Sequence, residues 1–202
     1  MKMRHPLPSP NQTWAHAVSS KTILAEILQT NQNNITAIEA DILMGKYENN
    51  DILHIDQENL HERCNNWQPI MAHPPDRISD LSADLFLEMT LRNNANFHLK
   101  LDFKELDAVK PVLSKVLLEL QNCKEFDSEE GLRCIHLNAD VLPGPGMYNQ
   151  GARISGDDFL NVCHEVLQSS KDDRIIWSYS LGWNTDCRAY WGYTGNNVTI
   201  IR

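Results

Sequence analysis

Charged side chains alternate with apolar ones in several segments of this 202-residue sequence. In the segment AIEADI, one alanine separates Glu39 from Asp41. In HLKLDFK, Lys100, Asp102 and Lys104 alternate with leucine and phenylalanine. Side chains two positions apart lie on the same face of a β-strand. If these segments are strands, each one has an apolar face and a face that carries ionisable groups.

A third segment, HLNADV, shows the same alternation and places His136, Asn138 and Asp140 on the polar face. Two other histidines, His16 and His73, lie near the ends of short segments that we also expect to be strands. Loops and residues at the carboxyl ends of parallel strands meet at one edge of a sheet or barrel. We therefore expect one site that is formed by His16, Glu39, Asp41, His73, Lys100, Asp102, Lys104, Asn138 and Asp140.

Grouped carboxylates are costly to bury unless cations lie among them. Glu39, Asp41 and Asp102 offer the oxygen ligands that hard divalent ions such as Mg²⁺ or Ca²⁺ prefer. His16 and His73 could exchange protons near neutral pH as general acid and base. Together with the lysines, these groups suit phosphoryl chemistry, in which charge on phosphate oxygens must be stabilised.

A structural explanation of the same residues is also open. Lys100, Lys104 and backbone amides could balance the carboxylates as an ion network, and a single histidine in a strand is more often a hydrogen-bonded core residue. The set as a whole favours a functional site, because burying so many ionisable groups has a high free-energy cost.

The elements that must position these residues alternate between short apolar segments and helical patterns. Strands are expected at Thr13–Val18, Thr36–Met44, Pro69–His73, Asn96–Phe103, Arg133–Leu142 and Arg174–Trp183. Helices are expected from Ser19 or Ser20 to Gln29, from Asp80 or Ser82 to Arg92, over Glu105–Asn122 and over Ser155–Gln168. This alternation is typical of βαβ units and a parallel sheet.

The expected fold class is α/β, a TIM-type (β/α) barrel whose site is built by loops such as Gly45–Gln68 and Pro143–Arg153. Such barrels typically contain about 250 residues, whereas this chain has 202. Beyond the sixth strand only Asn197–Ile201 has a strand pattern. We therefore expect a tail at residues 1–12 and a single domain at 13–202, with about six βα units and an incomplete C-terminal end.

The composition restricts the partners. With 27 acidic and 18 basic residues, the net charge is −9, which disfavours nucleic acids and anionic membranes because both attract basic surfaces. We find neither a run of about 18 apolar residues, as a membrane span requires, nor a secretory signal pattern. Five cysteines without a CxxC pair disfavour a disulfide framework or a zinc site and favour an intracellular, cytoplasmic setting.

Six ordered motifs resemble those of the menorin family. They are HAVSSK, IEADIL, PIMAHPPD, KLDFK, LNADVLPGP and SLGW, and they extend from about Trp14 to Trp183. That family in turn looks related to phospholipase-C-like phosphodiesterases of the TIM-barrel type, which include glycerophosphodiester phosphodiesterases and sphingomyelinase D enzymes. For menorin-like proteins, the resemblance implies an extracellular setting.

The more distant resemblance implies roles for single residues. His16 matches the catalytic histidine of the first strand, and His73 matches the second catalytic histidine. Glu39, Asp41 and Asp102 match ligands of Mg²⁺ or Ca²⁺. The candidate substrate contacts are Lys100, Lys104, Asn138 and Asp140, of which Lys104 matches a lysine of those enzymes and the others come from the face pattern and the menorin-like motifs.

Two positions differ from the glycerophosphodiesterase pattern. Ala17 and Val18 follow the first histidine where those enzymes have Arg and Gly, and Pro74 follows the second histidine where they usually have Asp. The expected phosphate-contacting arginine is therefore absent from that position. This combination predicts that a metal pocket can persist while catalysis is altered or lost.

Three functions are consistent with the sequence. The first is a metal-dependent phosphodiesterase that acts on a glycerophosphodiester or a lysophospholipid. The second is a non-catalytic module that binds a protein partner, as implied by menorin-like extracellular cues in neuronal patterning. The third is an inactive short form.

Overall fold

Five parallel strands form the main sheet of the protein. The computed structural model describes residues 13–30, 35–48, 67–92, 97–122, 133–144, 152–168, 170 and 175–184. The main strands, in their order across the sheet, are β1 (Trp14–Ala15), β2 (Ala37–Tyr47), β5 (His98–Phe103), β6 (Arg133–Pro143) and β7 (Ile175–Asn184). Each strand runs parallel to its neighbour. All six strands expected from the sequence are present, including β3, described below.

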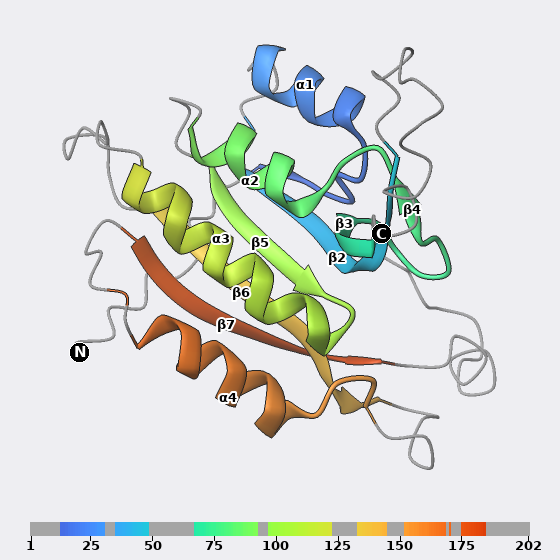
Figure 1. The fold of residues 1–202 in the computed structure, drawn as a ribbon, viewed down its shortest axis with the longest axis vertical. Coiled ribbons are helices and arrows are strands. Elements are labelled where there is room, and N and C mark those ends of the chain that lie inside the picture. The colour runs from blue at the N-terminus through green and yellow to red at the C-terminus, as the bar shows by residue number, and fades with distance from the viewer. Residues whose placement is uncertain are drawn as a thin grey trace, which may run out of the picture.

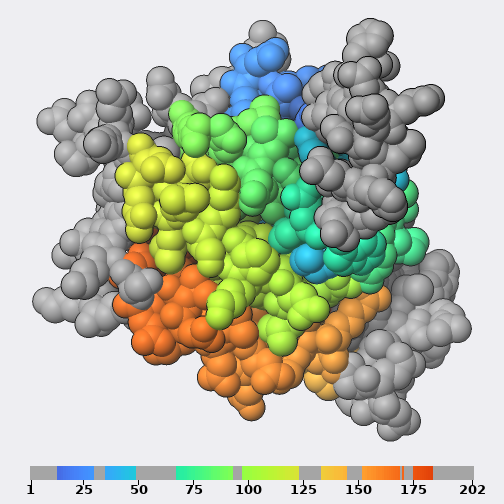
Figure 2. All heavy atoms as spheres, in the orientation of Figure 1, coloured from blue at the N-terminus to red at the C-terminus, as the bar shows by residue number. Residues whose placement is uncertain are grey.

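Helices cover one face of this sheet, as Figure 1 shows for α2, α3 and α4. The helices among the described residues are α1 (Lys21–Thr30), α2 (Ala83–Leu91), α3 (Val109–Asn122) and α4 (Gly156–Leu167), and the 3-10 turn η3 (Leu106–Ala108) precedes α3. Figure 2 shows that α2, α3 and α4 form a continuous packed surface on this side. None of the described helices is long and apolar enough to cross a membrane.

Local sequence signals explain where the helices begin. The Ser82 hydroxyl accepts a hydrogen bond from the backbone N–H of Leu85, and Ser155 caps α4 in the same way through Asp158. Such side-chain acceptors satisfy N–H groups that have no partner in the first helical turn. Pro111 lies in the first turn of α3, where its missing N–H costs no intrahelical bond.

The core lies between the sheet and the helices. The apolar residues of β2, Ile38, Ala40 and Ile42, are completely buried, and Leu113 of α3 and Phe159 of α4 are buried in the same cluster. The polar residues between them therefore lie on the opposite face of the sheet. This confirms the alternation that the sequence predicted for the strands.

Strand β3 (Trp67–Met71) differs from the expected βαβ order. It runs antiparallel to β2, with Ile42 opposite Met71, while β4 (Ile78–Ser79) pairs in parallel with the end of β2. The pairing of β2 with β5 ends at Ile42, so the rest of β2 extends beyond β5 and pairs with β3 and β4 instead. Expecting a further parallel strand at this point was wrong.

The sheet is not closed among the described residues, because β1 and β7 lie at its two edges. The fold is therefore a mixed α/β fold with a mostly parallel sheet of seven strands, and a TIM barrel is not confirmed. The central parts of the two expected loops and the expected strand Asn197–Ile201 lie outside the described residues.

Gly45→Ala should destabilise the hairpin of β2 and β3. A Cβ atom at Gly45 would lie 2.7 Å from the backbone oxygen of Arg77 and closer still to Ile70, so backbone must shift. We expect a loss of about 1–3 kcal/mol, typical of overpacking, in urea denaturation. The matched control is Gly156→Ala, where Val141 is 3.5 Å away; an equal loss there would contradict the steric explanation.

Candidate functional site

Strand register arranges the polar side chains into two rows across the open face of the sheet. The glutamate row consists of Glu39, Lys100, His136 and Ser178. The aspartate row consists of Asp41, Asp102, Asn138 and Ser180. Each residue is directly opposite the next on a neighbouring strand, so the pairing brings together side chains that are about 40 to 60 positions apart in the sequence.

Lys104 joins the two carboxylates of the aspartate row. Its Nζ lies 2.9 Å from Asp41 Oδ1 and 2.8 Å from Asp102 Oδ2, and only 12% of its side chain is exposed. Burial raises the pKa of Asp41, and the hydrogen bond from Lys104 only partly opposes this effect. Burial alone would lower the pKa of Lys104, but the attraction of Asp102 and Asp41 outweighs it and raises that pKa.

Asp102 keeps one acceptor without a partner. Its Oδ1 atom is buried and makes no hydrogen bond to the described residues, although the other oxygen contacts Lys104. A buried acceptor left unpaired costs about 1–3 kcal/mol. Among the described residues, this oxygen is therefore an acceptor position that a cation or a water molecule could fill.

Glu39 has partners for both oxygens. Lys100 Nζ donates to Oε1 at 2.7 Å, and Nδ1 of His16 makes a very short contact with Oε2. The Trp14 ring lies 6.3 Å from the His16 ring. His16 is otherwise exposed, with 66% of its side chain accessible. Glu39 therefore holds His16 by Nδ1, and no described residue forms a hydrogen bond with its Nε2.

His136 belongs to the same row and was not singled out as a site residue from the sequence. Its Nδ1 lies 2.5 Å from the Ser178 hydroxyl, and the Trp14 ring is 5.9 Å from its own ring. Burial lowers the pKa of His136, and nearby His98 and Lys100 lower it further. The alternation in HLNADV was the signal for its position, but a half-buried histidine that is bonded to a serine fits a structural role.

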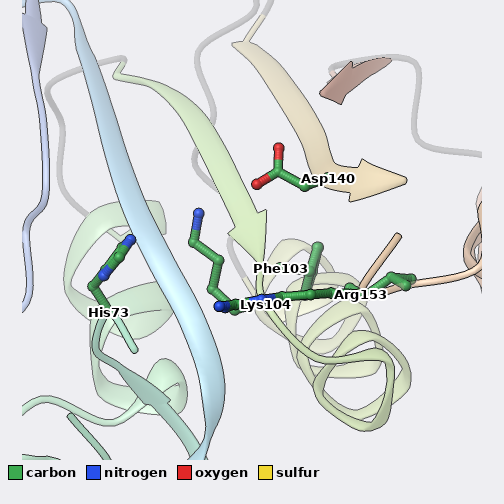
Figure 3. Close-up of a pocket in the computed structure, with 6 residues that line it drawn as sticks. His73, Phe103, Lys104, Asp140 and Arg153 are labelled. Atoms are coloured by element: carbon green, nitrogen blue, oxygen red, sulfur yellow. The ribbon is translucent and has the colours of Figure 1, made fainter. Parts of the chain in front are cut away.

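A cavity of about 110 Å³ lies at the carboxyl ends of the strands, beside Lys104. Its lining residues are His73, Phe103, Lys104, Asp140, Arg153 and Ile154. In Figure 3 the Lys104 side chain extends between His73 and Asp140, while Arg153 reaches in from the loop before α4. This is the edge at which parallel α/β sheets usually bind ligands.

His73 follows β3 and is held by its backbone neighbours. The N–H of Ala72 donates to the Asp41 carbonyl at 3.0 Å, and Nδ1 of His73 lies 2.7 Å from the Pro74 carbonyl oxygen. A carbonyl only accepts, so Nδ1 is the donor and Nε2 remains available. The antiparallel hairpin thus brings His73 to the cavity, although the sequence had predicted a parallel strand.

The structure brings most of the expected site residues together. Glu39 and Lys100 form one ion pair, Asp41, Asp102 and Lys104 form another ion-paired group, and both lie on the same face of β2 and β5 as one charge cluster. Asn138 lies beside Asp102 in the aspartate row, and His73 and Asp140 line the cavity. His16 does not line the cavity and joins the cluster through Glu39. Sequence reasoning missed Arg153, because only the Gly-rich loop that contains it was recognised.

The described side chains are not arranged as a metal centre. Among them, no three His, Cys, Asp or Glu residues could hold a metal ion as they stand, because Lys104 lies between the aspartates. The chemistry of the donors nevertheless suits Mg²⁺ or Ca²⁺, since Asp41 and Asp102 offer hard oxygens and Asp102 Oδ1 lacks a partner. Both oxygens of Glu39 already have partners, Lys100 and His16.

Fold and site define an α/β protein with a mostly parallel sheet and a charged cluster on its open face. Residues 10–202 match the family model described as the menorin N-terminal domain, so the chain belongs to the menorin family. The human protein FAM151B is 32% identical over 173 residues, covering 86% of this chain and 49% of that protein. The chain thus spans about half the length of this relative. No solved structure matches the chain.

Removing the Lys104 charge should be costly. Lys104→Met leaves two largely buried carboxylates without their cation, so we expect a loss of about 3–5 kcal/mol in unfolding free energy, measured by urea denaturation with a chelator present. Adding Asp41→Asn should recover part of this loss. The control is Lys110→Met, because Lys110 and Glu165 form an exposed pair worth about 0.5 kcal/mol. Equal losses in the two lysine variants would contradict our description of the cluster.

Proposed function

We propose that this protein cleaves phosphodiesters, with a glycerophosphodiester or a lysophospholipid as substrate and Mg²⁺ or Ca²⁺ as cofactor. The main support is the largely buried charge cluster of Glu39, Asp41, Asp102 and Lys104, next to a cavity that His73 also lines. Such a cluster is costly for stability alone, and perturbed ionisable groups beside a cavity are typical of functional sites.

The finer fold that we propose is a TIM-type barrel of which the described sheet forms one wall. Two observations support it: the main strands are all parallel, and the helices α2, α3 and α4 lie on one face (Figure 1). In such a barrel the polar face would line the interior, and the cavity would lie at the carboxyl end of the strands, where barrel enzymes have their active sites.

In the proposed reaction, the oxygen of an attacking hydroxyl forms a bond to phosphorus while the bond to the leaving oxygen breaks. One of His16 and His73 takes the proton of the attacking hydroxyl, and the other gives a proton to the leaving oxygen. Nδ1 is engaged in both histidines, with Glu39 and with the Pro74 carbonyl, so Nε2 is the atom that exchanges the proton in each.

Lys104 has the electrostatic role in this scheme. Its ammonium group lies at the cavity and would balance negative charge on the phosphate oxygens. The candidate metal ligands are Glu39, Asp41 and Asp102, and a divalent ion held there would supply further positive charge to the phosphate. Lys100, Asn138 and Asp140 remain the other proposed substrate contacts.

Loss of either catalytic histidine should reduce turnover. We expect His16→Ala and His73→Ala to lower the rate of product release from a glycerophosphodiester or lysophospholipid by about 10²–10⁴-fold, the usual contribution of general acid–base catalysis. The matched control is His164→Ala, since His164 is exposed on α4 and should leave the rate unchanged. Normal turnover in either site variant would refute this mechanism.

Divalent ion binding can be tested without turnover. Titration calorimetry with Mg²⁺ and with Ca²⁺ should show binding to the unaltered protein and a clear loss of affinity in Asp41→Asn, which removes a charged oxygen ligand. Asp157→Asn on the exposed first turn of α4 serves as the control. An isotherm that Asp41→Asn leaves unchanged would show that the metal site is placed wrongly.

One observation favours a second function, a non-catalytic module that binds a protein partner. Lys104 already balances Asp41 and Asp102, so the cluster is held together by side chains of the chain itself. Ala17 and Pro74 stand where related phosphodiesterases have Arg and Asp. A protein that binds the divalent ion but releases no product from any phosphodiester would support this second function.

A further inference from the structure

Two oppositely charged side chains line the cavity without pairing. Within the described part of the chain, Arg153 forms no ion pair within 4.0 Å and makes no hydrogen bond, and the Asp140 carboxylate accepts none. Lys104, by contrast, is already held by Asp41 and Asp102. Arg153 and Asp140 are therefore the charged lining residues that no described side chain pairs directly, although Arg153 is near enough to Glu105 to lower the pKa of that carboxyl.

We infer that Arg153 binds the phosphate group of the ligand, and that Asp140 restricts this ligand to a single negative charge. The inference rests on the proposed function and specifies the substrate as a phosphodiester monoanion rather than a phosphomonoester. A guanidinium presents several N–H groups in one plane and binds phosphate oxygens in pairs. Arg153 thus supplies the positively charged side chain that is missing from position 17, where this sequence has Ala17.

The loop before α4 explains why this arginine was not apparent from the sequence. In the glycerophosphodiesterase pattern the arginine follows the first histidine, and here that histidine comes just after β1. Strand β1 lies at one edge of the sheet, whereas β6, the strand before α4, lies next to the other edge. Here Ala17 occupies that position, with a positive φ of 54°, and its methyl group cannot contact a phosphate electrostatically. Arg153 reaches the cavity from a different element (Figure 3).

Gly182 leaves the room that the Asp140 carboxylate occupies. The two residues are opposite each other on β6 and β7, and a Cβ atom at Gly182 would overlap Asp140 Oδ1. Asp140 therefore needs a glycine at this position on β7 to keep its present conformation. The glycine of the SLGW motif thus has a physical role. The alternation of side chains along β7 would not by itself require a glycine there.

The size and charge of the cavity support selection against dianions. Its volume is about 110 Å³, and Arg153 and Asp140 both line it, so a phosphate group bound there would lie near both charges. A phosphomonoester carries about −1.5 to −2 charges at pH 7 because its second pKa is near 6, whereas a diester carries one. In so small a space the second charge is repelled by Asp140.

Phosphorus NMR titrations with dimethyl phosphate and methyl phosphate test the inference in the presence of a chelator, so that only protein groups bind the anion. At pH 8 we expect the unaltered protein to bind dimethyl phosphate about tenfold more tightly than methyl phosphate. Arg153→Gln should weaken both ligands at least about tenfold. Asp140→Asn should strengthen the binding of methyl phosphate more than that of dimethyl phosphate, because the repulsion by Asp140 scales with the ligand charge, and should thereby reduce the preference.

Three controls make the result specific. At pH 5 methyl phosphate is a monoanion, so its disadvantage should disappear in the unaltered protein. Gly182→Ala, which displaces the Asp140 carboxylate, should reduce the preference as Asp140→Asn does, and thermal melts of each variant establish that it is folded. Lys110→Gln, a charge change on an exposed helix residue, should leave both affinities unchanged.

Several outcomes would overturn the inference: equal binding of the two anions at pH 8, no binding of either, no effect of Arg153→Gln, or equal effects of Asp140→Asn on both. These outcomes are separate from failure of the proposed function. If the binding pattern is found but no diester is cleaved, the phosphodiesterase proposal fails and the ligand assignment stands. If diesters are cleaved but Asp140→Asn leaves the preference for dimethyl phosphate over methyl phosphate unchanged, the ligand assignment fails while the phosphodiesterase proposal stands.

Discussion

The ammonium group of Lys104, held between Asp41 and Asp102, is the interaction on which the polar side of this protein depends. The two aspartates lie opposite each other on β2 and β5, where like charges in a largely buried setting repel strongly. The lysine changes this repulsion into attraction and links the two central strands at the carboxyl end of the sheet. Because it also lines the cavity, the residue that stabilises the cluster is also the one that faces a ligand.

The apolar face of the sheet fixes where these charges lie. A shift of one residue in the register of β5 against β2 would place Lys100 and Asp102 under the helices and expose Leu99 and Leu101. The buried contacts with α2 and α3 exclude that arrangement. The hydrophobic core therefore determines which side chains share the open face, and the ion pairs then determine how those side chains are oriented on it.

This dependence explains how much could be predicted from the sequence. The alternation in AIEADI, HLKLDFK and HLNADV is a local property, and it correctly placed Glu39, Asp41, Lys100, Asp102 and Asn138 on one face. The predicted direction of β3 was wrong because a segment of five residues contains no information on whether it pairs in parallel or antiparallel with its neighbour. Arg153 was missed because a loop has no periodicity, and its side chain reaches the cavity only through the tertiary fold.

The charge of the site gives a criterion for its chemistry. Glu39, Asp41 and Asp102 carry three negative charges against the two positive charges of Lys100 and Lys104, a net −1 when His16 is neutral. Arg153 and Asp140 cancel each other, so a phosphate monoanion approaching the cavity meets a net negative cluster. A divalent cation would change that sum to +1, whereas protonation of His16 would only neutralise it. Strong phosphate binding and catalysis therefore favour a bound cation, while a partner protein with a basic surface would bind the cluster without one.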